Sequence, residues 1–125
     1  METVSEEFAT MRGELQLELV EAQGQAADAE AAAAEAVATR VASEAARDAV
    51  QAAVAPLGNS IGGALANRLA DKTRALQAAT GAVARTAGIA DAARRRVADL
   101  ETSIGQIEEL MTPTEPATAP VEPVQ

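Results

Sequence analysis

Large apolar residues recur every seven positions in the second half of the chain. Between residues 64 and 111 there are eleven Val, Ile, Leu, Met and Phe residues, and nine of them occupy two of the seven heptad positions. So narrow a stripe is typical of a coiled-coil seam, whereas a helix that covers a globular core has a wider one. The pattern predicts a helical arm over residues 64–111 whose seam consists of Leu65, Leu69, Leu76, Val83, Val97, Leu100, Ile104, Ile107 and Met111.

The first half of the chain carries a weaker version of this repeat. Residues 3–55 contain no proline and are rich in Ala, Glu, Gln and Leu, which favour a helix. Thr3 and Glu6 have the spacing of a capping box that would start this helix. Half of the twelve large apolar residues between positions 3 and 57 lie on the seven-residue series through Phe8 or three positions after it. We therefore predict a helical arm over residues 3–55, and seam positions at Phe8, Leu15, Val50 and Leu57.

Helix-breaking residues separate the two arms. Proline removes a backbone donor and disfavours helical backbone at the residue before it, and glycine weakens a helix interior. Asparagine and serine can cap a new helix. We predict a hinge over residues 56–63 that depends on Pro56, Gly58, Asn59, Gly62 and Gly63, with Asn59 and Ser60 as candidate caps.

The two repeats fit an antiparallel hairpin. A turn at Asn59 and Ser60 pairs positions whose numbers add up to 119, which places Phe8 opposite Met111 and Ser43 opposite Leu76. Small residues then oppose large ones through the middle of the seam, so that the side chains can interdigitate. The expected fold is all-α, a long antiparallel helical hairpin that forms an Ala-rich coiled coil. The alternative is one long kinked helix in a parallel homo-oligomeric rod.

Composition limits the chemistry of the chain. Alanine supplies 33 of the 125 residues, so a core would bury little area per residue and we expect partners to contribute to stability. The chain has no Cys and no His, which excludes disulfides and the usual zinc sites and removes the commonest general base. The only run of bases, Arg94–Arg96, lies in a chain of net charge −9 that has a single aromatic residue. We therefore expect no enzyme activity, no cofactor, no metal and no nucleic-acid binding.

Residues 112–125 contain four prolines and predict an extended Pro-rich tail. The features together favour a structural subunit, a homo-oligomeric coiled coil within a larger assembly such as a phage fibre, spike or other virion component. Its partners would be further copies of itself and other proteins of that assembly. We expect a soluble protein of the cytoplasm or a virion, with no signal peptide and no membrane span.

The alternative function is a helical-hairpin adaptor or chaperone. It would bind a partner protein through apolar residues near the two ends of the chain, namely Leu15, Leu17, Leu19, Val20, Leu100, Ile107 and Leu110.

Overall fold

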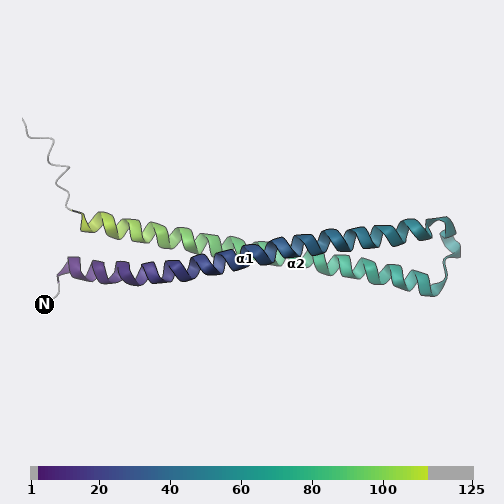
Figure 1. Ribbon diagram of the computed structural model, residues 1–125, viewed down its shortest axis with the longest axis horizontal. Helices are drawn as coiled ribbons and strands as arrows, with labels where there is room; N and C mark the ends of the chain where they lie inside the picture. Colours follow the sequence, from purple (N-terminus) through teal and green to yellow (C-terminus); the bar gives the residue numbers. More distant parts are fainter. Residues whose placement is uncertain (1–2, 113–125) are drawn as a thin grey trace, which may run out of the picture. The chain divides into compact units, whose positions relative to one another are not determined.

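Two long helices packed against each other as a hairpin make up the computed structural model, which describes residues 3–112 (Figure 1). Helix α1 spans Val4–Val54, the 3-10 helix η1 spans Ala55–Ser60, and α2 spans Gly63–Met111. The predicted all-α helical hairpin is confirmed, and the chain does not form the single kinked helix of the alternative. The predicted Pro-rich tail lies outside the described residues from position 113 onward.

The two long helices begin in different ways. The N–H of Thr3 donates to Glu6 Oε1 and the N–H of Glu6 donates to Thr3 Oγ1, both at 3.1 Å, which is the predicted capping box. The expectation that Asn59 or Ser60 would cap α2 is wrong. Both residues belong to η1, and the backbone carbonyl of Gly62 accepts the first hydrogen bond, from the N–H of Ala66 at 3.0 Å.

The reversal between the helices depends on one glycine. Gly58 has φ 52° and ψ −127°, a combination that side-chain-bearing residues almost never adopt. Pro56 lies at the start of η1, where its fixed φ is tolerated and its missing N–H costs no hydrogen bond. After Ser60, Ile61 is extended and α2 begins two residues later.

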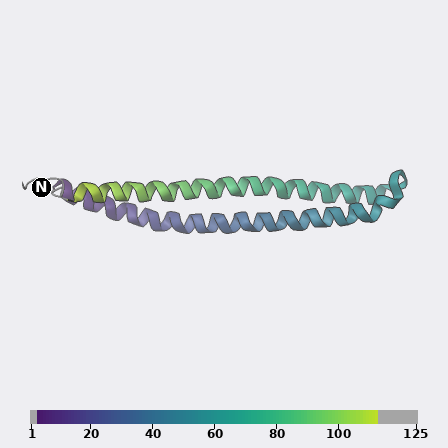
Figure 2. The same cartoon turned by 90° about the horizontal axis from the view of Figure 1, so that it is seen from above.

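The chain divides into two compact units, and in each one a segment of α1 lies beside a segment of α2 in both views (Figure 1 and Figure 2). The first unit contains residues 1–25 and 94–125, and the second contains residues 26–93. In the first unit, the buried residues are Ala22, Leu100, Ile104 and Ile107. The predicted seam residues Phe8, Leu15, Val97 and Met111 are half-buried beside them.

The second unit has a core of small side chains. Its buried residues are Ala26, Ala79 and Ala90, and its half-buried ones include the predicted seam residues Val50, Leu69, Leu76 and Val83. Thr73 and Thr86 also face the seam, and each donates its hydroxyl to a carbonyl one turn earlier on its own helix. The hydroxyls therefore enter the seam without leaving an unsatisfied donor.

Burial along α1 corrects the second position of its repeat. Every residue of the Phe8 series, which runs through Phe8 in steps of seven to Val50, is at least half-buried. So is every residue of a second series four positions later, from Arg12 to Val54, which we call the Arg12 series. The residues three positions after the Phe8 series do not face the seam in the same way, since Val4 and Met11 are 64% and 40% exposed.

Two predicted seam residues near the turn lie outside the seam. Leu57 is 43% exposed because it falls in η1, where the helical phase of α1 is lost, and Leu65 is 44% exposed. One heptad after Leu65 comes Lys72, which the pairing rule sets opposite Arg47. Two cations cannot share a buried position. Near Lys72, which is exposed, the inward residues of α2 are therefore Ala66, Leu69, Ala70 and Thr73.

Replacing Leu100, which is 5% exposed, should lower the free energy of unfolding far more than replacing Leu110, which is 66% exposed on the same helix. We expect Leu100→Ala to cost about 2 to 4 kcal/mol, because it removes buried methyl groups from a seam that cannot collapse around the gap. Leu110→Ala should change stability by about 0.5 kcal/mol or less. Urea unfolding followed by circular dichroism measures both, and equal effects would mean that Leu100 is not in the core.

Replacing Gly58 by alanine should destabilise the hairpin by about 1 to 3 kcal/mol, because of its backbone angles. Gly62 is the matched control, since its φ is ordinary and an added methyl group would meet nothing within 4 Å. Gly62→Ala should be neutral or slightly stabilising. Thermal unfolding of the two variants compares them, and a neutral Gly58→Ala would contradict this role of the turn.

Candidate functional site

The acidic side chains, which are the possible metal ligands of a chain without His or Cys, are spread along the helices. Within residues 3–112 no group of three or more acidic side chains is placed to hold a metal ion. Neither α1 nor α2 has a stretch long and apolar enough to cross a membrane. All five predicted hinge residues, Pro56, Gly58, Asn59, Gly62 and Gly63, are exposed.

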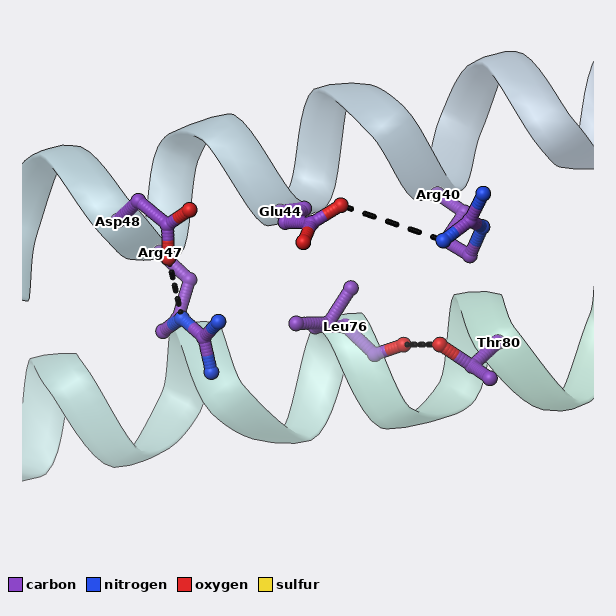
Figure 3. A network of polar contacts seen from close by, with 6 residues as sticks. All are labelled: Arg40, Glu44, Arg47, Asp48, Leu76 and Thr80. Atoms are coloured by element: carbon purple, nitrogen blue, oxygen red, sulfur yellow. Dashed lines mark hydrogen bonds and ion pairs between the residues drawn. The ribbon is translucent and has the colours of Figure 1, made fainter.

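Three arginines occupy positions of the seam, which the apolar pattern did not indicate. Arg12, Arg40 and Arg47 all belong to the Arg12 series and are half-buried. Arg40 lies 4.0 Å from Glu44, and Arg47 donates to Asp48 Oδ1 at 2.9 Å. Figure 3 shows Leu76 of α2 opposite the turn of α1 between Arg40 and Glu44. The long arginine stems can cover the apolar seam while the guanidinium groups bind carboxylates at its edge.

One ion pair joins α1 to α2 within the first unit. Arg96 Nη2 lies 3.6 Å from Glu18 Oε1, and both side chains are about half exposed. The arginine run therefore contributes an inter-helix contact through Arg96. In contrast, the ion pairs Arg40–Glu44, Arg47–Asp48 and Arg74–Asp71 of the second unit each lie within one helix.

The apolar residues considered for partner binding separate into two groups. Leu100 and Ile107 are buried in the first unit, and Leu15 and Leu19 are half-buried, so these four serve the hairpin itself. Leu17, Val20 and Leu110 are 75%, 67% and 66% exposed. Of these seven residues, only Leu17, Val20 and Leu110 are thus available to a partner.

Leu17 and Val20 belong to a regular stripe on α1 that lies on the side away from the seam. The stripe consists of Gly13, Leu17, Val20 and Gly24, which we call the outer face. Its spacing of four, three and four residues is that of the apolar positions of a coiled coil. Glu14 and Glu21 follow Gly13 and Val20 directly and so lie along one edge of the outer face. Both are exposed, and neither has an ion-pair partner within residues 3–112.

Sequence reasoning named Leu17 and Val20 as candidate binding residues but missed the outer face, because it grouped them with the seam residues Leu15 and Leu19. The sequence feature that could have indicated it is the lack of charged residues at positions spaced alternately four and three residues apart from Gly13 onward. Leu17 and Val20 lie on this spacing and lie on neither series that faces α2.

Comparison of the chain with protein-family models, with curated proteins and with solved structures gives no match.

The contact between Glu18 and Arg96 should add little to stability, because both side chains are about half exposed. A double-mutant cycle with Glu18→Gln and Arg96→Gln should give a coupling of about 0.2 to 1 kcal/mol. The coupling should fall in 1 M salt, which screens exposed charges. Urea unfolding of the four proteins at low and high salt measures it, and a larger, salt-independent coupling would contradict a surface contact.

Proposed function

We propose that the chain is a non-enzymatic protein-binding subunit, a helical hairpin that presents exposed apolar side chains to another protein. The observation that carries the proposal is where these side chains lie. Of the ten exposed large apolar residues within positions 3–112, the five in the first unit are Val4, Met11, Leu17, Val20 and Leu110. Leu17 and Val20 are among the most exposed of the ten and lie one turn apart on one face of α1. A pair of large apolar side chains on a regular helical face is a typical protein-interaction surface.

The way in which the hairpin uses its heptad repeat supports this choice. The repeat in residues 64–111 was one reason to expect a homo-oligomer, but its residues, except Leu65, face α1 of the same chain. A seam that is already occupied within the chain does not require further copies. Any partner must therefore use side chains that the hairpin leaves exposed.

The structural-subunit function remains the second proposal. A hairpin that binds helices through its outer face can also serve as one element of a larger assembly, including a virion component. The small residues along both helices, such as Gly81 and Gly88 on α2, would permit close packing with further subunits. In that case, the partner would be another copy of the chain or a second protein of the assembly.

Photo-crosslinking in the native cell tests the proposal. A benzoylphenylalanine residue at position 17 should form adducts with another protein, whereas the same residue at the exposed position of Gln77 on α2 should not. Adducts that contain only two copies of this chain would favour the homo-oligomeric structural subunit. The absence of adducts from position 17, with a correctly folded variant by circular dichroism, would contradict protein binding through this face.

A further inference from the structure

We infer that the outer face of α1 in the first unit binds a helix of another protein, one with apolar heptad positions flanked by Lys or Arg. The inference rests on the proposed function and adds the chemistry of the partner. It depends on three features of the outer face: its spacing, its glycines and the charges along its edge.

The spacing fits a helix as the partner. Gly13 and Val20 occupy the positions equivalent to d of a heptad, and Leu17 and Gly24 occupy those equivalent to a. Side chains at these positions fit as knobs into holes on a facing helix. In the second unit α1 continues this spacing with small or apolar residues that are all exposed, namely Ala27, Ala31, Ala34, Ala38 and Val41. No charged residue therefore occurs at a position equivalent to a or d of the outer-face repeat between Gly13 and Val41.

The two glycines have no role within the hairpin. Glycine inside a helix costs about 1 kcal/mol relative to alanine. At Gly13 and at Gly24, an added methyl group would meet nothing within 4 Å, so no close approach within the described residues requires them. Small residues allow the backbone of a neighbouring helix to come close. Their positions, one turn before Leu17 and one turn after Val20, indicate that this neighbour crosses α1 at the exposed pair.

The charge along the edge determines the partner's chemistry. Glu14 and Glu21 lie at positions equivalent to e, where residues of the two helices of a coiled coil form inter-helix ion pairs. Asp28 and Glu35 continue this row on α1 in the second unit. The equivalent g positions hold Gln16 and Gln23, which are neutral. A partner with bases at its flanking positions would complement the acidic row, and one with acids would be repelled.

The outer face of a second copy does not supply those bases. Between Val4 and Gln25, α1 carries five acids and one base, and that base, Arg12, lies in the seam. Pairing of two outer faces would therefore bring acidic rows or neutral glutamines together and would form no ion pairs. We therefore assign the face to a basic helix of a different protein, and the sedimentation experiment below tests whether a second copy, whose α2 carries seven bases and two acids over residues 64–96, occupies it instead.

A designed peptide tests the inference directly. The probe is a fluorescent four-heptad helix with Leu and Val at its apolar positions and Lys at every e and g position, and the control peptide carries Glu at those positions. Fluorescence anisotropy with the full chain should show binding of the Lys peptide at least tenfold tighter than that of the Glu peptide. The Lys peptide should bind more weakly as salt is raised.

Variants of the chain locate the binding surface. Leu17→Glu with Val20→Glu should weaken binding of the Lys peptide at least tenfold, whereas Ile89→Glu, at a residue 61% exposed on α2, should not. Glu14→Lys with Glu21→Lys should reverse the preference between the two peptides. Gly13→Ala with Gly24→Ala should raise the melting temperature of the chain, because both positions have room for a methyl group. The same variant should bind the Lys peptide more weakly.

The outcomes separate the partner's chemistry from the proposed function. Equal binding of both peptides, or no loss in the Leu17 and Val20 variant, would overturn the inference. A dimer in sedimentation equilibrium that this variant converts to a monomer would also overturn it, because a second copy would then occupy the face. Crosslinks from position 17 to another protein without binding of the Lys peptide would leave the proposed function standing and reject only the basic helix.

Discussion

Burial of a narrow apolar stripe between two antiparallel helical segments is the interaction on which the rest of the structure depends. All seven buried residues within positions 3–112 lie on the heptad series that face the opposite helix, and none of them is polar. A pair of helices has no third layer, so each helix buries one stripe and leaves its other faces to solvent or to a partner. The exposure of Leu17 and Val20 follows from this constraint, because they lie on the far side of α1.

The stripe differs in character between the two units. Leucine and isoleucine side chains fill it in the first unit, where full burial of each contributes about 1.5 to 3 kcal/mol. The buried residues of the second unit are alanines, which contribute much less area. There the helices depend more on the high helix propensity of alanine and on ion pairs within each helix, such as Arg40–Glu44. Arginines at the edge of the seam are compatible with this thin core because their charged groups stay at the surface.

Because each helix buries only one stripe, the exposed outer face of α1 is the best candidate for function. A chain with no His, no Cys and one Phe has few groups for chemistry, and within residues 3–112 its acidic side chains form no group that could hold a metal ion. What it offers instead is a regular surface of small and apolar residues edged by acids. Such a surface can select a partner helix by the fit of its side chains and by its charge.

The sequence by itself determined the helices, the place of the turn and most of the seam in α2. These follow from local rules: proline and glycine break a helix at Pro56 and Gly58, and the spacing of Leu69, Leu76 and Val83 selects one face. It did not determine the second series of α1. The Arg12 series holds two large apolar residues, Leu19 and Val54, and the series three positions after Phe8 also holds two, Val4 and Met11. Only the tertiary structure chose between them, since α2 must pack against one side of α1. That choice also placed Arg12, Arg40 and Arg47 at the seam, and the local structure on either side of the turn left Leu57 and Leu65 outside it.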